Sequence, residues 1–211
     1  MSSDSGYLHP ELEPAEHAAC REAARRQLEL ATRAEPATSE AVTSIITTHG
    51  GAVERFGTRL KCLESLDRKT QTAMARNIKV EGFGGCAEDI VAEIGDVLRY
   101  TAVLPDREYW SCGTRIINAL IRAGYRPNEL SDGWVVGGYR GRNCSFVGSS
   151  GIEFEVQFHT RDSLAAAEDS HGDYELARDD ATPEPIRATA LRRLRATFAL
   201  VPAPADIRWV D

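Results

Sequence analysis

The chain has 211 residues, of which 42% are hydrophobic, so it can bury one good core but is short for two. Its 25 basic and 32 acidic residues give a formal net charge of -7, which disfavours nucleic acid as a general partner but leaves room for a local basic cleft. The five cysteines show no CxxC spacing, so a zinc site and a dense disulfide framework are disfavoured.

The N-terminal third of the chain predicts helices. Residues 14–34 are rich in Ala, Glu and Arg with a thin apolar stripe, which predicts a surface helix. Pro36 is expected to end this helix, and Thr38 or Ser39 to cap a second one that stops at Gly50. A third helix is expected to begin with Ser65 as its N-cap.

The middle of the chain predicts a sheet. A β-branched and aromatic segment over 97–103 is followed by a helical pattern over 107–124, then by a strand, which is a crossover unit. The β-type runs after this first strand are 125–130, 134–141, 142–148 and 152–160. Two helical patterns follow, over 163–178 and 183–200. The expected fold is α/β (α+β), a mixed sheet of four or five strands flanked by helices.

These patterns divide the chain into three parts. Residues 1–37 are expected to be a helical extension, 38–203 a catalytic domain and 204–211 a tail. The N-terminus has no signal-peptide pattern, and no apolar run reaches membrane-spanning length, so a cytoplasmic protein without membrane contact is expected.

The run IEFEVQFHT alternates strictly between apolar and polar residues. Ile152, Phe154, Val156 and Phe158 share one face of the predicted strand, and Glu153, Glu155, Gln157 and His159 the other. A carboxylate on the polar face could accept a proton from a hydroxyl or hold a metal ion. The alternation alone does not distinguish a catalytic Glu155 from an ordinary surface charge.

Three other groups of residues could carry chemistry. A basic run at the start of a predicted helix, Arg59, Lys61, Arg68 and Lys69, suits a polyphosphate, although a solvated helix face has the same pattern. Asp96 stands before the first strand and could hold Mg²⁺ or make a turn, with Arg99 expected on the opposite face. Tyr139 lies between glycines and the cations Arg140 and Arg142, and could stack on a base or simply pack.

In chain order, the segments RLKCLESLDRKT, DVLRYT, GYRGRN, EFEVQFHT and SLAAAEDSHGDYE resemble the synthetase domain of RelA/SpoT homologues. The segments LRYT and EVQFHT are similar to those of a divergent branch of small single-domain members, found among toxin- and phage-associated proteins. The resemblance implies a RelA/SpoT synthetase-like nucleotidyltransferase fold. It also implies an ATP- and Mg²⁺-dependent transferase that moves the β,γ-pyrophosphate of ATP to the 3′-hydroxyl of a purine nucleotide, as an alarmone synthetase does.

The resemblance also implies a role for each matching residue. Glu155 would be the general base, supported by Gln157 and Thr160, and Asp96 would hold Mg²⁺ together with Glu155. The implied nucleotide contacts are Arg59 and Lys61 beside ATP, Ser65 and Lys69 under its phosphates, Arg99 at the adenine and Tyr139 on the acceptor base, with Arg142 nearby.

Three features depart from the family pattern. Asp96 lies three residues before Arg99, where the family usually has five; Asn143 replaces a histidine; and Tyr139 is closer to Glu155 in sequence than expected. The acceptor therefore stays open between a purine nucleotide and an RNA 3′ end, with tRNA disfavoured by the net charge. A non-catalytic nucleotide-binding module is the third alternative, and a homo-oligomer is expected from the resemblance alone.

Overall fold

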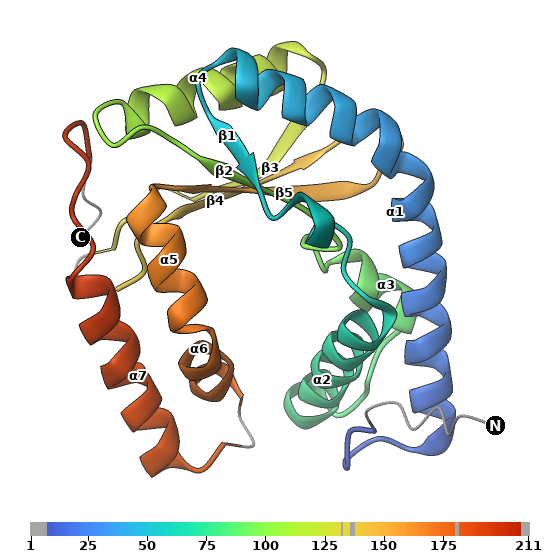
Figure 1. Cartoon of the computed structure of the whole chain (residues 1–211). Coiled ribbons are helices and arrows are strands. Elements are labelled where there is room, and N and C mark those ends of the chain that lie inside the picture. The colour runs from blue at the N-terminus through green and yellow to red at the C-terminus, as the bar shows by residue number, and fades with distance from the viewer. Residues whose placement is uncertain (1–7, 132, 136–137, 180–181, 208–211) are drawn as a thin grey trace.

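The chain folds into helices arranged around one mixed sheet (Figure 1). The structure, a computed structural model, describes residues 8–131, 133–135, 138–179 and 182–207. In chain order the elements are α1 (Pro14–Thr48), β1 (Ala52–Glu54), the 3₁₀ helix η1 (Phe56–Thr58), α2 (Leu63–Glu81), α3 (Ala87–Ala92), β2 (Leu98–Val103), α4 (Tyr109–Arg122), β3 (Arg126–Leu130), β4 (Arg142–Val147), β5 (Glu153–His159), α5 (Arg161–Asp169), α6 (His171–Arg178) and α7 (Glu184–Ala199).

The sheet has five strands in the order β1-β2-β5-β4-β3. Strands β2 and β5 pair in parallel, and the other neighbours are antiparallel. The expected α/β (α+β) class with a mixed sheet is confirmed. The fifth strand is not the expected one, because β1 was not predicted and the described part of 134–141 forms a loop.

Backbone hydrogen bonds next to a glycine hold the described residues of 134–141 in a loop. Trp134 N donates to Gly141 O at 3.3 Å, and Val135 N to Tyr139 O at 3.1 Å. Gly133 has φ +59°, and a Cβ there would lie 1.8 Å from Gly141 O. Only glycine allows this approach, so the β-type composition of 134–141 is overridden by the turn before it.

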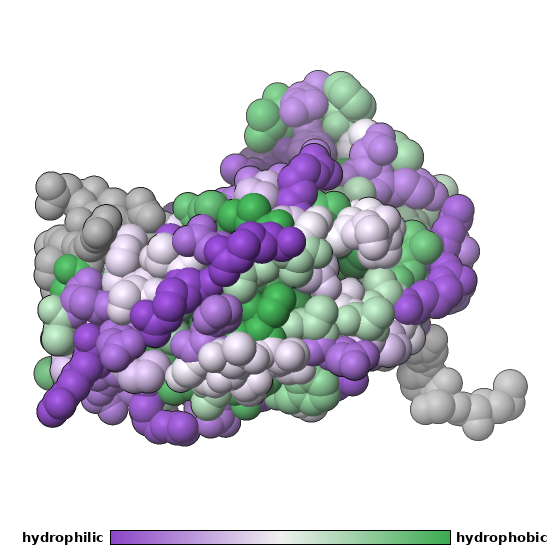
Figure 2. Space-filling model, turned by 90° about the horizontal axis from the view of Figure 1, so that it is seen from above, coloured by the Kyte–Doolittle hydropathy of each residue, from purple (hydrophilic) through white to green (hydrophobic). Residues whose placement is uncertain are grey.

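One face of the sheet carries the main hydrophobic core. Phe154, Val156 and Phe158 of β5 are buried there, which confirms the predicted alternation. The C-terminal half of α1 and the whole of α4 cover this face (Figure 1). Their outer surface shows hydrophilic and hydrophobic side chains intermixed (Figure 2). The opposite face of the sheet is therefore the one left for polar chemistry.

The expected helix break at Pro36 is wrong. Helix α1 continues through it to Thr48, because the loss of one N–H donor is offset by packing along the rest of the helix. Its expected role as a surface appendage is also wrong, since small side chains at Cys20, Ala23 and Ala24 are buried against α2 and α3. A stripe of alanines looks thin in sequence but lets helices approach closely.

Two other helix boundaries differ from expectation. Helix α2 begins at Leu63 with Cys62 as its N-cap, so Ser65 lies inside the first turn and is not the cap. The single helix expected over 163–178 is divided at Ser170 into α5 and α6. Thr160 caps α5 by accepting a hydrogen bond from Ser163 N at 3.0 Å, so its side chain serves the helix start.

The C-terminal segment is anchored to α4. Both oxygens of Asp206 accept backbone hydrogen bonds, from Trp110 N at 3.0 Å and from Ser111 N at 2.9 Å. Both N–H groups belong to the first turn of α4, where the helix itself supplies no acceptor for them. Burial alone would raise the pKa of Asp206, but these hydrogen bonds outweigh it and lower the pKa. The segment expected to be a tail thus supplies the cap of α4.

Candidate active site

The segment before α2 lies alongside the start of β2. Arg99 N donates to Arg59 O at 2.8 Å, and Lys61 N donates to Val97 O at 3.0 Å. Leu60 forms a bridge with Leu98 between these two hydrogen bonds. Backbone pairing of this kind sets two residues of the basic run, Arg59 and Lys61, beside the strand that carries Arg99.

Asp96 joins three cations at this place. Its Oδ2 accepts hydrogen bonds from Lys61 Nζ at 2.9 Å and from Lys69 Nζ at 2.7 Å. The same oxygen is in contact with Arg99 Nη2. The expectation that Asp96 and Arg99 point to opposite faces is therefore wrong. Asp96 precedes β2, where the alternation of strand side chains does not apply.

The electrostatics of the cluster follow from burial and charge. Burial alone would raise the pKa of Asp96, but Lys61, Lys69 and Arg99 outweigh it and hold the pKa well below its usual range. Burial lowers the pKa of Lys61, although Asp96 opposes that effect. One ionised carboxylate among three cations leaves a net positive group, which suits a polyphosphate.

Glu155 lies next to this cluster on the same face of the sheet. It is the register partner of Arg99 across the β2–β5 pair, and Arg99 Nε lies 3.6 Å from Glu155 Oε1. Burial raises the pKa of Glu155, while Arg99 and a hydrogen bond with Gln157 act in the opposite direction. A carboxylate with a raised pKa, 17% exposed, is a suitable proton acceptor. Glu155, Gln157 and the cluster are thus brought together.

Two carboxylate oxygens at the site have no hydrogen-bond partner in the part of the chain that the structure describes. Asp96 Oδ1 and Glu155 Oε1 are both buried and unsatisfied. Mg²⁺ takes oxygen ligands, and one or two carboxylates with substrate phosphates are enough to bind it. The described residues contain no group of three His, Cys, Asp or Glu side chains placed for a metal. The donor set therefore fits a magnesium ion brought in with a nucleotide.

Tyr139 and Arg142 lie outside the cluster. Tyr139 Oη donates to Asn143 Oδ1 at 3.1 Å and lies 3.1 Å from His159 Nε2. Its neighbour Gly141 approaches the Tyr139 hydroxyl, so this glycine makes room for the protein's own tyrosine. Arg142 points to the core face, with its guanidinium 4.4 Å from the centre of the Trp110 ring. The structure does not bring Arg142 to the cluster.

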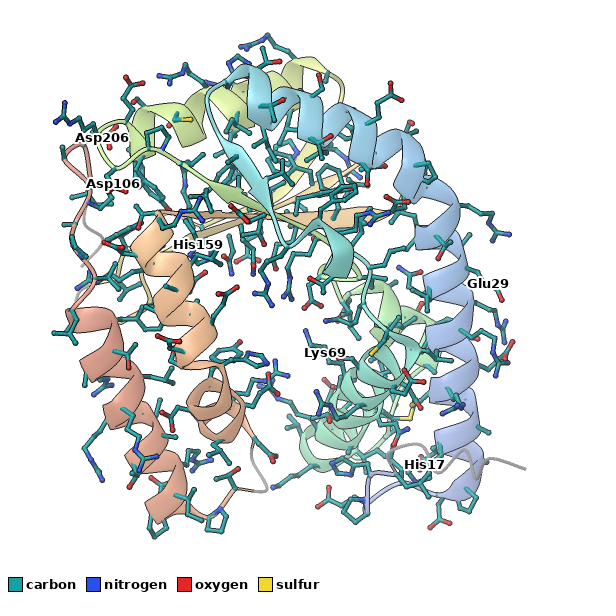
Figure 3. All side chains as sticks on the ribbon, viewed as in Figure 1. His17, Glu29, Lys69, Asp106, His159 and Asp206 are labelled. Carbon is teal, nitrogen blue, oxygen red and sulfur yellow. The ribbon has the colours of Figure 1, made fainter. Side chains whose placement is uncertain are left out.

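Of the other residues expected near the phosphates, Lys69 lies in the cluster, whereas Arg68 lies outside it. Lys69 joins the cluster from α2, and Figure 3 shows it pointing inward beneath the sheet. Ser65 lies on the first turn of the same helix, half-buried. Arg68 is exposed and lies 3.8 Å from Glu175 of α6, so it bridges α2 and α6 without entering the cluster.

Helix α1 contributes a further contact that no sequence pattern indicated. Glu35 is buried, and its Oε1 is in contact with Arg59 Nε. The segment around Glu35 was expected to break the helix at Pro36, so a role at the site could not be inferred from the pattern.

Comparison with known proteins gives a fold. No family model matches the chain, and no curated protein matches it. Among solved structures, the Bacillus subtilis small alarmone synthetase 1 matches at a TM-score of 0.52 with 14% identity, over 83% of this chain and 90% of that one. The chain has the alarmone synthetase fold.

Two further solved structures share this alarmone synthetase fold. The same Bacillus subtilis enzyme bound to its product pppGpp matches at a TM-score of 0.52 and 14% identity, over 84% of this chain and 92% of that one. The type VI effector Tas1, solved with its immunity protein, matches at 0.50 and 18% identity, over 85% of this chain and 96% of that one. The expected RelA/SpoT-like fold with toxin-associated members is confirmed.

Within the described residues, no helix is long and apolar enough to span a bilayer.

Proposed function

We propose that this protein is an ATP- and Mg²⁺-dependent pyrophosphokinase that transfers the β,γ-pyrophosphate of ATP to the 3′-hydroxyl of a purine nucleotide. One observation carries the proposal: the cation cluster around Asp96 lies directly beside Glu155 on one face of the sheet. Phosphoryl transfer requires positive charge around the phosphates and a group that accepts the proton of the attacking hydroxyl. The alarmone synthetase fold supports the same reaction class.

Each residue of the cluster has a role in this proposal. Lys61, Lys69 and Arg99 bind and orient the triphosphate, and the negative charge that forms on its oxygens is offset by theirs. Glu155 accepts the proton of the 3′-hydroxyl while the 3′-oxygen forms a bond to the β-phosphorus. The bond from the β-phosphorus to the α,β-bridging oxygen breaks, and AMP leaves with that oxygen.

Gln157 and the two unsatisfied carboxylate oxygens complete the arrangement. Gln157 lies two residues along β5 from Glu155 on the same face, where it would orient that carboxylate toward the acceptor. Asp96 Oδ1 and Glu155 Oε1 would hold Mg²⁺, which offsets phosphate charge when bound. The positive charge of Lys61 and Lys69 around Asp96 leaves that carboxylate ionised throughout the turnover.

The acceptor is proposed to be a purine nucleotide with its base near Tyr139. Edge-to-face contacts with His159 and Phe198 fix the position of the Tyr139 ring, against which the acceptor base would lie. An RNA 3′ end is the less favoured acceptor, because a net charge of -7 opposes the many phosphate contacts that tRNA would make.

The test is AMP release from ATP and Mg²⁺ with GDP, GTP, ADP, AMP or tRNA as the acceptor. We expect AMP and a pyrophosphorylated product with at least one purine nucleotide. AMP formation with tRNA alone would move the proposal to an RNA acceptor. ATP binding seen by calorimetry without turnover on any acceptor would favour a non-catalytic module and overturn the enzymatic proposal.

The match to the type VI effector Tas1 supports a second, compatible proposal about the role of the reaction. We propose that unrestrained activity is toxic to a bacterial cell because it consumes ATP. Induced expression of the wild type should arrest growth, and expression of Glu155→Gln at the same level should not. Equal growth of the two cultures at equal protein levels would overturn the toxic role without bearing on the chemistry.

A further inference from the structure

Helix α1 reaches the candidate site through a buried polar chain. Glu35 has 8% of its surface exposed, and its Oε1 contacts both Arg59 Nε and Ser39 Oγ. Ser39 Oγ lies 2.9 Å from the hydroxyl of Tyr100, which is 1% exposed. Tyr100 follows Arg99 in β2. This series of polar contacts therefore links α1, the segment before α2 and strand β2 of the site.

Arg59 is held on three sides. Its Nε contacts Glu35, its Nη1 donates to Phe56 O at 2.9 Å, and its guanidinium lies 4.1 Å from the centre of the Phe56 ring. Nη2 has no partner among the described residues, and the side chain is 25% exposed. A guanidinium fixed at Nε, at Nη1 and over one face offers Nη2 and the other face to a ligand.

We propose that Glu35 is a positioning residue, which fixes Arg59 in the orientation that meets ATP and makes α1 a part of the nucleotide site. The inference rests on the proposed function and adds Arg59, whose backbone oxygen accepts a hydrogen bond from Arg99 N, to the residues that meet ATP. A buried carboxylate near a polyphosphate site is unfavourable unless it is paired with a cation that must be held in place. An arginine ordered before ATP arrives loses less conformational entropy on binding.

Two features separate this role from simple packing. The carboxylate of Glu35 meets the guanidinium at Nε, so within the described residues the pair leaves Nη2 available to a ligand. Glu35 stays ionised, because the hydrogen bonds from Arg59 and Ser39 lower its pKa. If only packing were needed at this place, an apolar residue of similar volume would serve without the cost of a buried charge.

The experiment is a calorimetric titration of the whole chain, with Mg²⁺, by an ATP analogue that has a methylene group between the α- and β-phosphorus atoms. Glu35→Gln keeps the shape of the side chain and should weaken binding about tenfold, as loss of an orienting partner commonly does. Arg59→Ala should weaken binding at least as much. The double variant should bind like Arg59→Ala alone, because Glu35 acts only through Arg59.

One control lies on helix α1, and a second variant lies in the series of polar contacts that includes Glu35. Glu29 is exposed on the outer side of α1 (Figure 3), so Glu29→Gln should bind like the wild type. Tyr100→Phe keeps the ring and removes the hydroxyl that supports Ser39, and should weaken binding about threefold. This second variant tests the same role if Glu35→Gln does not fold, since its effect should also vanish in the Arg59→Ala background.

The outcomes distinguish this inference from the proposed function. If the folded wild type does not bind the analogue, both are overturned. If the wild type binds and Glu35→Gln binds equally well, only the positioning role is overturned. The same holds if Glu35→Gln weakens binding as much in the Arg59→Ala background as in the wild type, because the effect would then pass through the scaffold.

Discussion

Arg99 of β2 and Glu155 of β5 are register partners in the parallel pair of strands, and Arg99 Nε lies 3.6 Å from Glu155 Oε1. Arg99 also contacts Asp96, so one guanidinium stands between the two carboxylates of the site. Its positive charge reduces the repulsion between the two carboxylates before any ligand binds. The first two predictions concern these carboxylates.

Glu155→Gln should lower the rate of AMP release at least about 100-fold, because a general base commonly contributes that much. Thermal unfolding should change little, since Gln157 can still hydrogen-bond to the new amide. Glu153→Gln is the matched control on the same strand and face: Glu153 accepts a hydrogen bond from Asn128 Nδ2 at 3.0 Å and, within the described residues, forms no ion pair with Lys61, Lys69 or Arg99. Loss of activity in Glu153→Gln, or its retention in Glu155→Gln, would contradict the assignment.

Asp96→Asn should lower the free energy of unfolding by about 1–3 kcal/mol, less than a fully buried pair because Lys69 and Arg99 are partly exposed. The cause is repulsion among cations that lose their shared carboxylate. Inorganic pyrophosphate should stabilise this variant more than the wild type. Urea unfolding measures both effects. Asp89→Asn, on the exposed side of α3, should match the wild type, and equal stability of Asp96→Asn would refute the account of the cluster.

Asp206→Ala should lower the free energy of unfolding by about 1–2 kcal/mol, because α4 loses the acceptor for two N–H groups of its first turn. Asp206→Asn should recover part of this loss, since its amide oxygen can accept one of the two hydrogen bonds. Urea unfolding followed by circular dichroism is the measurement. An alanine variant as stable as the wild type would show that the C-terminal segment does not stabilise α4.

The free energy of unfolding should fall as pH decreases from about 6.5 to about 4. Burial lowers the pKa of His159 to about 4, and Arg55 acts in the same direction. A histidine with a depressed folded pKa favours folding above its unfolded pKa, and this contribution is lost as pH falls toward the folded value. His159 Nδ1 lies 2.9 Å from Ser163 Oγ and its Nε2 faces Tyr139, so no carboxylate in contact with it offsets the charge.

The measurement for His159 is urea unfolding at about pH 7.5 and about pH 5. His159→Phe removes the titrating group and should reduce the difference between the free energies of unfolding at the two pH values. The variant should be less stable than the wild type at both pH values. His171→Gln, at an exposed position on α6, should keep the wild-type difference. An unchanged pH dependence in His159→Phe would show that other groups cause the acid sensitivity.

Local patterns predicted the elements whose periodicity was strong. The alternation in 152–160 placed Phe154 in the core and Glu155 on the polar face, and the structure has both there. The helix over 107–124 was predicted for the same reason. Prediction failed where packing overrode the pattern: α1 continues through Pro36, and the run after Gly133 is a loop. Propensity is a weak guide when tertiary contacts oppose it.

The amino-acid pattern alone showed which side chains share the polar face of β5 and which residue types could serve the site. Period-two alternation is a property of the strand alone, so it can be seen without any partner. The contacts of Asp96 with Lys61, Lys69 and Arg99, the orientation of Arg142 toward the core, and the contact of Glu35 in α1 with Arg59 are visible only in the folded chain. These contacts join segments that are distant in sequence, and their geometry depends on strand register and helix packing, which no local pattern specifies.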